Sequence, residues 1–318
     1  LGKNTRVQAF SVFGGVEQGP QIAKLEKGID ILITTPGRLF DLRHQGFIKL
    51  NRVEMLVLDE ADHMLDLGFI KDIRDLIQYL PRKRQTLFFF FFFDDEIKDL
   101  AYSLVKNPVR IQVSPKDPVS KNVDHSVVFV AMDDKRFFLE RLVKENPESK
   151  ILVFVRTKVR CERVQAAMDR VGVSSVFMHG GKDQQDRMDV LNTFKLGNVK
   201  MLIATDVSAR GIDIPDVDFV VNYDLPEHPE NYVHRVGRTG RGRKKGLAYA
   251  FCDDAERDLL KAIEDYISKP VKILELHTDG YKEITNFSIT KNLTLKDIIA
   301  ELEPQPNKRY GVKKAKKK

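Results

Sequence analysis

The sequence predicts an α/β protein with two parallel-sheet domains in tandem. Short apolar runs alternate with amphipathic helical patterns, which is typical of parallel strands whose connecting helices cover both faces of a sheet. The alternation stops once, at residues 114–122, where two prolines lie among polar residues. The chain has 318 residues, of which 42% are hydrophobic, and this is enough apolar material for two buried cores.

The first alternating series covers residues 1–114. We expect strands at residues 7–13, 29–33, 55–58 and 86–89, with an amphipathic helix at residues 70–80 between the last two. Residues 115–124 contain both prolines of the break, and we interpret them as an interdomain linker.

The second series covers residues 125–270. Its apolar runs predict six strands, at residues 126–130, 151–155, 175–178, 201–204, 219–222 and 247–251. Amphipathic patterns predict helices at residues 135–145 and 158–171. We expect this second domain to be intact, and residues 271–318 to form a carboxyl-terminal extension with a lysine-rich tail.

The charge of the chain is concentrated at its carboxyl end. The formal net charge is +7, and residues 301–318 supply +5 of it through seven lysine and arginine side chains against two glutamates. Such a tail suits either a sequence-independent anchor for phosphate backbones or a solubilising segment. The extension is also where we expect any protein partner to bind.

Other broad features favour a monomer in the cytoplasm. No apolar stretch approaches the roughly 18 residues of a membrane span, and no charged-then-apolar leader is visible, so we expect no membrane partner. Cys161 and Cys252 lack a Cys-x-x-Cys partner, and we interpret both as buried thiols rather than as metal ligands or a disulfide.

The most informative segment is residues 234–241, His-Arg-Val-Gly-Arg-Thr-Gly-Arg. It spaces three arginines at intervals of three residues, and the guanidinium fork matches phosphate oxygens. Gly237 and Gly240 let the main chain approach a ligand that a Cβ atom would obstruct. The segment therefore predicts a phosphate-binding element, with a solvated basic turn as the alternative.

A second informative segment, residues 59–62, reads Asp-Glu-Ala-Asp and follows the apolar run at residues 55–58. Ligands of open parallel sheets bind at the carboxyl ends of the strands. One carboxylate there can hold Mg²⁺ through its water shell while its neighbour orients an attacking water. An acidic pair can also simply cap a helix.

Further blocks accompany these two segments in a fixed order. They are Gly14-Gly15, Thr35-Pro36-Gly37-Arg38, Phe154-Val155-Arg156-Thr157, His179-Gly180 followed by Gln184 and Arg187, and residues 204–213, which read Ala-Thr-Asp-Val-Ser-Ala-Arg-Gly-Ile-Asp. With these blocks the chain resembles the DEAD-box RNA helicases of superfamily 2 from about residue 7 to about residue 270. The short spacing and the lysine-rich tail are similar to the bacterial RhlE-like branch.

The resemblance implies two RecA-like domains that bind ATP and Mg²⁺ in the cleft between them. By this likeness Asp59 binds Mg²⁺ through water, Glu60 positions the hydrolytic water, and Asp62 and His234 meet where the domains contact. Arg238 and Arg241 resemble arginine fingers for the γ-phosphate. The remaining nucleotide-linked residues implied are Asp213, which contacts the ribose, and Arg210 and Gly211.

The resemblance also implies RNA binding across both domains. Small residues and hydroxyls predominate in the implied set, so the grip would be on the backbone and independent of base sequence. The implied residues are Gly15, Thr35, Gly37, Arg38, Arg156, Thr157, Gln184, Arg187, Thr205, Asp206 and Gly211.

Three blocks that the family carries before the Gly-Gly pair do not occur in these residues. They are an adenine-recognition motif, a further RNA-contacting motif and a phosphate-binding loop that ends in Gly-Lys-Thr; no Gly-rich loop followed by Lys-Ser or Lys-Thr occurs here. We therefore expect the downstream part of a longer helicase, with an incomplete first domain and no ATPase activity of its own. The alternative is a non-catalytic RNA-binding or scaffold module. A DNA-directed superfamily 2 translocase is a lesser rival.

The second departure from the family is a run of six phenylalanines at residues 88–93. Phe90, Phe91 and Phe92 occupy the places where the family has Ser-Ala-Thr, whose hydroxyls couple hydrolysis to unwinding. Phenylalanine has no hydrogen-bonding group, and six in a row form an aggregation-prone window. We favour an altered or misassigned segment over a genuine phenylalanine strand.

Mass spectrometry of the peptide that covers residues 88–93 tests this interpretation. We expect a mass that differs from that of six phenylalanines, because a natural strand at this place needs hydroxyl groups. A mass that matches six phenylalanines would show that the run is genuine.

Overall fold

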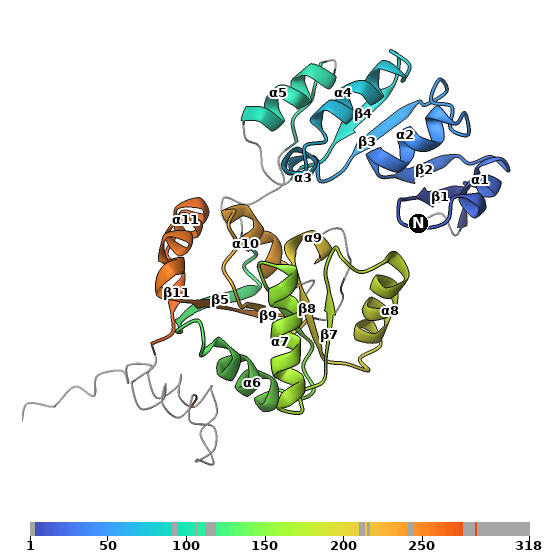
Figure 1. Ribbon diagram of the computed structural model, residues 1–318. Coiled ribbons are helices and arrows are strands. Elements are labelled where there is room, and N and C mark those ends of the chain that lie inside the picture. The colour runs from blue at the N-terminus through green and yellow to red at the C-terminus, as the bar shows by residue number, and fades with distance from the viewer. Residues whose placement is uncertain are drawn as a thin grey trace, which may run out of the picture. The chain divides into compact units, whose positions relative to one another are not determined.

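A computed structural model of the protein describes residues 4–90, 95–105, 107–111, 119–209, 214, 217–240, 244–275 and 284. The chain divides into two compact units, which we call unit 1 (Leu1–Val113) and unit 2 (Ser114–Lys318) (Figure 1). Both units alternate strands with helices, as the apolar periodicity predicts.

Unit 1 contains two separate pairs of parallel strands. Its elements in chain order are β1 (Ala9–Val12), α1 (Gly19–Leu25), β2 (Ile31–Thr34), α2 (Pro36–His44), β3 (Met55–Leu58), α3 (Ala61–Asp66), α4 (Ile70–Gln78), β4 (Gln85–Phe88) and α5 (Asp95–Leu104). β1 pairs with β2, and β3 pairs with β4.

One face of each strand pair in unit 1 is packed and the other is open. Leu39 and Leu42 of α2 are buried against Val12 on the packed face. The side chains that alternate with the packed ones are 49–56% exposed, and they are Ile31, Ile33, Met55 and Val57. Parallel strands normally have both faces covered. The expectation of a sheet covered on both faces is therefore not met by the described residues of unit 1.

Unit 2 is built on one seven-stranded parallel sheet with the order β11-β5-β10-β9-β6-β8-β7. Its elements are β5 (Val123–Phe129), α6 (Lys135–Glu145), β6 (Ile151–Phe154), α7 (Lys158–Arg170), β7 (Ser175–Met178), α8 (Gln184–Lys195), β8 (Met201–Ala204), α9 (Asp206–Ala209), β9 (Phe219–Asn222), α10 (Pro229–Val236), β10 (Gly246–Cys252), η2 (Asp254–Glu256), α11 (Arg257–Ile267) and β11 (Lys272–Ile273).

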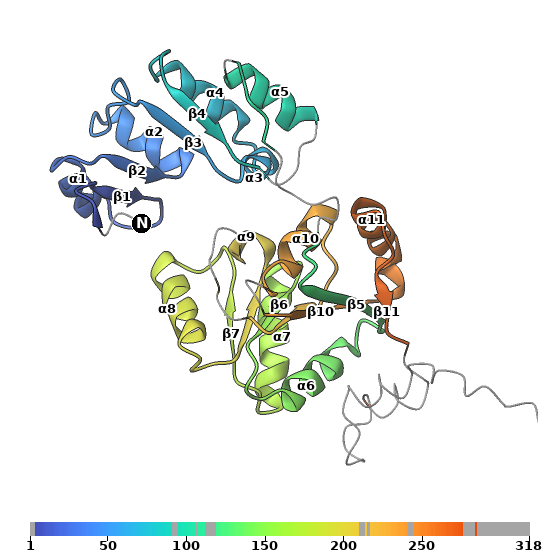
Figure 2. The same ribbon diagram turned by 180° about the vertical axis from the view of Figure 1, so that it is seen from behind.

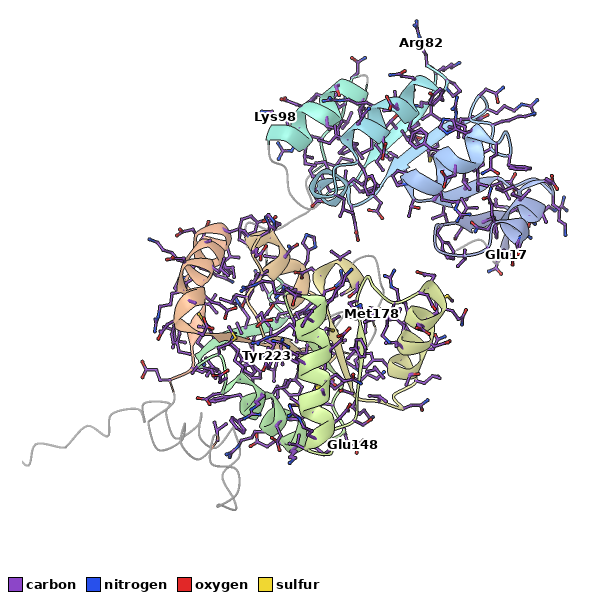
Figure 3. The ribbon with its side chains drawn as sticks, viewed as in Figure 1. Glu17, Arg82, Lys98, Glu148, Met178 and Tyr223 are labelled. Carbon is purple, nitrogen blue, oxygen red and sulfur yellow. The ribbon has the colours of Figure 1, made fainter. Side chains whose placement is uncertain are left out.

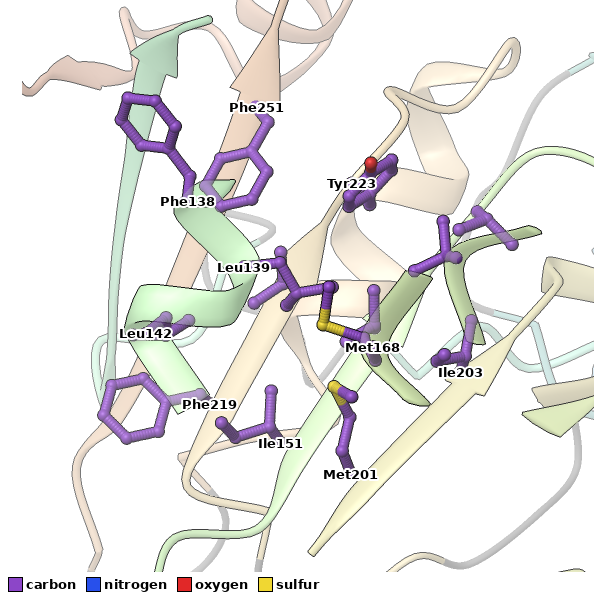
Figure 4. Packing of buried hydrophobic residues seen from close by; sticks show 14 of the residues in the cluster. Phe138, Leu139, Leu142, Ile151, Met168, Met201, Ile203, Phe219, Tyr223 and Phe251 are labelled. Carbon is purple, nitrogen blue, oxygen red and sulfur yellow. The ribbon is translucent and has the colours of Figure 1, made fainter. Parts of the chain in front are cut away.

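Helices cover both faces of this sheet. α6 and α7 pack on one face, where Phe138 and Leu139 join Ile151, Met201 and other alternate strand residues in one core (Figure 4). On the other face the guanidinium carbon of Arg235, from α10, lies 5.1 Å from the centre of the Phe154 ring. α10 in turn packs beside α11 (Figure 2). Because both faces are covered, the central strands are buried along their whole length.

The predicted elements agree well with the structure. The bounds of β3, β7, β8, β9 and α6 are those predicted from the sequence. β5 begins at Val123, three residues earlier than predicted, because its first residues pair with Gly246 and Leu247 of β10. Strand β11, the 3-10 helix η2 and the helices α1, α2, α3, α5, α8, α9, α10 and α11 were not among the elements named from the sequence.

Two further predictions concern cysteines and membranes. Cys161 and Cys252 are buried and unpaired. Burial raises the pKa of the Cys161 thiol to about 12 and that of Cys252 to about 11, so both are protonated at neutral pH. Among the described residues, no helix has both the length and the apolar character needed to cross a membrane.

The fold makes a direct prediction about stability. Leu139 is fully buried in the α6–α7 core, so Leu139→Ala should lower the free energy of unfolding by about 2–5 kcal/mol through lost packing. Leu196 is 77% exposed, and Leu196→Ala should change stability by less than about 0.5 kcal/mol. Urea unfolding followed by circular dichroism measures both. Equal losses would contradict this assignment of the core.

Candidate functional site

The carboxyl ends of all seven strands in unit 2 meet at one edge of the sheet because every strand pair is parallel. The loops after β6, β7 and β8 carry the predicted RNA contacts at this edge, and α10 follows β9 there. Glu148 precedes β6 and marks the opposite edge, whereas Met178 ends β7 at the loop edge (Figure 3). The sequence blocks of unit 2 are therefore neighbours in space.

Arg235 of α10 connects the ends of two strands, β8 and β9, from a fully buried position. Its Nε and Nη2 donate to the two carboxylate oxygens of Asp206 at 2.6 and 2.7 Å, which is a bidentate ion pair. Its Nη1 donates to the Asn222 side chain at 3.1 Å and to the Asp224 carbonyl at 2.7 Å. One side chain thus fixes α10 to the ends of β8 and β9.

The loop after β8 is held by a hydroxyl network. Ser208 donates through Oγ to the Met178 carbonyl at 2.7 Å and accepts from the Thr205 amide at 3.1 Å. The Thr205 hydroxyl lies 3.1 Å from the same Oγ, and Thr205 is buried. The Thr205 hydroxyl and the Asp206 carboxylate therefore both have partners within the protein, and about a fifth of the Asp206 side chain stays exposed.

The loop after β7 is ordered by His179. The Gly181 amide donates to His179 Nδ1 at 3.0 Å, so the ring proton is on Nε2, which lies 3.1 Å from the Glu162 carboxylate. α8 then begins at Gln184, whose side-chain oxygen accepts from Arg187 Nη1 at 3.3 Å. The Nε of Arg187 is buried and has no hydrogen-bond partner among the residues that the structure describes.

The loop after β6 presents Arg156 and Thr157. The Thr157 hydroxyl caps α7 by accepting from the Arg160 amide at 3.1 Å. Arg156 donates through Nη2 to the Glu256 carboxylate at 2.8 Å and to the Leu225 carbonyl at 3.3 Å. About a third of the Arg156 side chain remains exposed.

The end of the arginine segment packs against the start of β5. Gly240 has a φ of +68°, and a Cβ atom there would lie 2.6 Å from a methyl carbon of Val123. The Thr239 hydroxyl donates to the Val217 carbonyl at 2.6 Å. His234 and Arg238 lie next to this turn and are partly buried. The contacts of Thr239 and Gly240 therefore restrain the main chain from which these two side chains extend.

In unit 1 the acidic segment forms a strained turn after β3. The Ala61 amide donates to the Phe89 carbonyl at 3.0 Å, and the Phe89 amide donates to the Leu58 carbonyl at 2.8 Å. Glu60 has a φ of +50°, which is uncommon for a residue other than glycine and is a form of strain found at functional sites. The first residues of the phenylalanine run thus hold this turn through their backbone.

The turn offers carboxylates for a cation held through water. Asp59 and Glu60 are exposed, and Asp59 Oδ1 accepts from the Glu60 amide at 3.0 Å. Asp62 is half-buried in α3. No group of three or more His, Cys, Asp or Glu side chains among the described residues could enclose a metal directly. The donor set fits Mg²⁺ bound through its water shell at Asp59.

The other predicted residues of unit 1 gather at one edge of the β1–β2 pair. Gly15 lies in a turn after β1 with a φ of +78°, and Thr35 and Gly37 begin α2 after β2. Arg38 Nη2 donates to the Val16 carbonyl at 3.3 Å and so joins both loops. Arg38 Nε and Nη1 are buried and have no hydrogen-bond partner in the described structure.

Four predicted site residues lie outside the described residues, and these are Arg210, Gly211, Asp213 and Arg241. Sequence reasoning placed Arg235 among the three arginines of a phosphate-binding element, whereas the structure buries it in the ion pair with Asp206. It gave no role to Asn222, Asp224, Lys135 or Glu256, which also hold the loops in place. A signal was present for two of them: Lys135 and Glu256 occupy core positions of the apolar periodicity of their helices.

Comparison with known proteins agrees with this arrangement. The model of the DEAD/DEAH box helicase family matches residues 1–90, and that of the helicase conserved C-terminal domain matches residues 134–243. DEAD-box ATP-dependent RNA helicase 46 of Arabidopsis thaliana is 39% identical over 288 residues, which are 88% of this chain and 44% of that protein. ATP-dependent RNA helicase RhlB of Shewanella amazonensis is 37% identical over 89% of this chain and 65% of its own length.

A solved structure is also similar. S. cerevisiae Dbp5 bound to RNA and ADP BeF3 has a TM-score of 0.78 and 28% sequence identity, over 90% of this chain and 74% of that chain. The chain spans about half to two thirds of the length of the two curated relatives above.

The Arg235 ion pair makes a prediction. Arg235→Lys keeps the positive charge but cannot donate to Asp206, Asn222 and Asp224 together, so unfolding free energy should fall by about 2 kcal/mol. Arg257 is 57% exposed, and its contacts with Asp254 and with the Phe129 ring, 4.5 Å away, are ones that a lysine can also make, so Arg257→Lys should change it by less than about 0.5 kcal/mol. Urea midpoints compare the two, and equal effects would refute the role given to Arg235.

Proposed function

The chain belongs to the DEAD/DEAH box helicase family, and on that premise we propose that it comes from an ATP-dependent RNA helicase. This enzyme remodels RNA duplexes or RNA–protein complexes when ATP closes two RecA-like domains on each other. Support comes from the relatives named as RNA helicases and from the similar Dbp5 structure, which is bound to RNA and ADP BeF3.

The observation that carries the RNA assignment is that two half-buried arginines of the predicted RNA set have unmatched guanidinium donors; among the described residues Arg84, which is outside that set, has one as well. Arg38 in unit 1 and Arg187 in unit 2 have buried guanidinium nitrogens without hydrogen-bond partners in the described structure. Leaving such donors unmatched is costly, and phosphate oxygens are their natural acceptors. Both residues are in the predicted RNA set, together with the exposed Gly15, Thr35, Gly37, Arg156 and Thr157 and the half-buried Gln184.

Backbone contacts would serve RNA at the loop after β8. Since the Thr205 hydroxyl and the Asp206 carboxylate bind inside the protein, we assign the phosphate contacts there to main-chain amides. Recognition of this kind is independent of base sequence, as the family resemblance also implies.

For ATP, we propose the roles that the resemblance implies. Mg²⁺ bound by water at Asp59 would neutralise phosphate charge, and Glu60 would orient the attacking water from its exposed position in the strained turn. Asp62 and His234 would couple the two domains. Arg238 and Arg241 would neutralise charge on the γ-phosphate, Asp213 would contact the ribose, and Arg210 and Gly211 would belong to the same nucleotide-linked group. Of these, Arg241, Arg210, Gly211 and Asp213 lie outside the described residues.

Turnover also needs a phosphate-binding loop, and no such loop occurs in these 318 residues. We therefore propose that the chain alone lacks ATPase activity and that a longer protein supplies the loop. Four expectations from the sequence stay predictions. They are a cytoplasmic location, a monomeric state, protein partners of the carboxyl-terminal extension and membership of an RhlE-like branch.

ATPase assays test this function. The 318-residue chain should show no RNA-stimulated ATP hydrolysis, because it cannot hold the β- and γ-phosphates. The longer protein should hydrolyse ATP when RNA is added and lose this turnover on Glu60→Gln. Glu148 is 91% exposed at the opposite edge of unit 2, so Glu148→Gln is the control and should leave turnover unchanged.

Two outcomes would contradict the proposal. Turnover by the 318-residue chain that Glu60→Gln abolishes would show that no further loop is needed. An inactive longer protein with an intact phosphate loop would favour the non-catalytic module. Stimulation by DNA equal to that by RNA of the same length would favour the DNA translocase, because only RNA carries 2′-hydroxyls.

A further inference from the structure

We propose that the buried pair Lys135–Glu256 is a positioning device that aims Arg156 at a backbone phosphate of bound RNA. The inference rests on the proposed RNA-binding function and adds two residues to it that touch no RNA themselves. They come from elements far apart in sequence, the first residue of α6 and the last residue of η2.

Glu256 is a carboxylate whose two oxygens both receive two donors. Oε1 accepts from Arg156 Nη2 at 2.8 Å and from the Leu225 amide at 3.1 Å. Oε2 accepts from Lys135 Nζ at 2.5 Å and from the Asp253 amide at 3.3 Å. These four donors hold the carboxylate in one position and one orientation. Glu256 is therefore a rigid partner for Arg156.

Lys135 supplies the charge that lets Glu256 stay buried. The Lys135 side chain is 0% exposed, and that of Glu256 is 3% exposed. Burial of a lone carboxylate is costly, and the ammonium group offsets that cost at short range. This pairing explains why α6 has a lysine at a core position, where an apolar residue would otherwise pack.

A second carboxylate holds the main chain of the same loop. The Arg156 amide donates to Asp224 Oδ2 at 3.1 Å, and Asp224 Oδ1 lies 3.3 Å from Arg160 Nη2. The cluster Lys135, Arg156, Arg160, Asp224 and Glu256 therefore has three positive and two negative side chains. The two arginines are its most exposed members, with side chains 34% and 27% exposed, and a phosphate that reached Arg156 would replace the solvent-exposed Glu227 carboxylate as its outer partner.

The guanidinium group of Arg156 has nitrogens for two purposes, one for anchoring inside the protein and the others for binding a phosphate. Nη2 makes both inward hydrogen bonds, to Glu256 and to the Leu225 carbonyl, and so holds the guanidinium plane. Nε is 3.9 Å from the exposed carboxylate of Glu227, a contact that solvent screens. An arginine fixed in this way loses less rotamer freedom when it binds a phosphate than an unrestrained one would.

RNA binding by variants of the 318-residue chain tests the proposal, with a fluorescein-labelled single-stranded oligouridine and fluorescence anisotropy across a salt series. Arg156→Ala should weaken binding roughly tenfold and should lower the slope of log K against log salt by about 0.7, which is one phosphate contact. Lys135→Met/Glu256→Gln should change both quantities in the same direction, because the bond that anchors Arg156 is reduced from a charge-assisted to a neutral one.

The decisive comparison combines the variants. In an Arg156→Ala background, Lys135→Met/Glu256→Gln should cause no further change in affinity or salt slope, because the pair acts only through Arg156. Arg170→Ala is the matched control, since it removes an equal charge from the other end of α7, and it should leave the salt slope unchanged.

The double substitution is chosen because it removes both buried charges and leaves neither unpaired. Circular dichroism shows whether each variant folds. If the double variant does not, Glu256→Asp carries the same test, since it keeps the charge but withdraws the carboxylate by one methylene. It should weaken binding in the wild-type background and have no effect beside Arg156→Ala.

Several results would overturn the inference. If Arg156→Ala leaves binding unchanged while Arg187→Ala weakens it, Arg156 is only a counter-ion, and the RNA-binding function stands. If the pair variants leave the salt slope unchanged, or weaken binding equally beside Arg156→Ala, the pair does not act through Arg156. If the unaltered chain fails to bind oligouridine, the proposed function fails with the inference.

Discussion

The parallel direction of the seven strands in unit 2 is the constraint on which its candidate site depends. Because every strand pair runs the same way, all carboxyl ends lie at one edge, and loops far apart in sequence become neighbours. No single loop makes the site. Arg156 follows β6 and bonds to Glu256 and Leu225, and Asp206 follows β8 and bonds to Arg235 of α10, while Gln184 and Arg187 follow β7 and bond to each other.

Buried ion pairs hold these loops together. Arg235 joins the ends of β8 and β9 to α10, and the Lys135–Glu256 pair joins the start of α6 to the end of η2. Apolar packing has no preferred direction, whereas a bidentate pair or a four-donor carboxylate fixes an angle as well as a distance. The cost of desolvating such charges offsets much of their mutual attraction, so an intact pair contributes little net stability. Its main effect is to fix the geometry of the loops.

The two units differ in how completely their strands are covered. Unit 2 buries its central strands on both faces, whereas β2 and β3 of unit 1 expose Ile31, Ile33, Met55 and Val57 on one face. The two units also differ in how the loops of their candidate sites are held. The acidic turn of unit 1 has its carboxylates exposed and is held by backbone bonds to Phe89, while the loops of unit 2 are cross-linked by side chains.

The sequence by itself determined the fold class, the positions of most strands and the family, because apolar periodicity and ordered short motifs are local properties of the chain. β3, β7, β8 and β9 coincide with their predicted bounds for this reason. The tertiary structure alone decided which side chains are free for a ligand. Thr205 and Asp206 face inward, Arg38 and Arg187 keep unmatched donors, and Arg235, Lys135 and Glu256 act as supports. Such pairings join residues up to 121 positions apart, and only the packed sheet brings them within hydrogen-bonding distance.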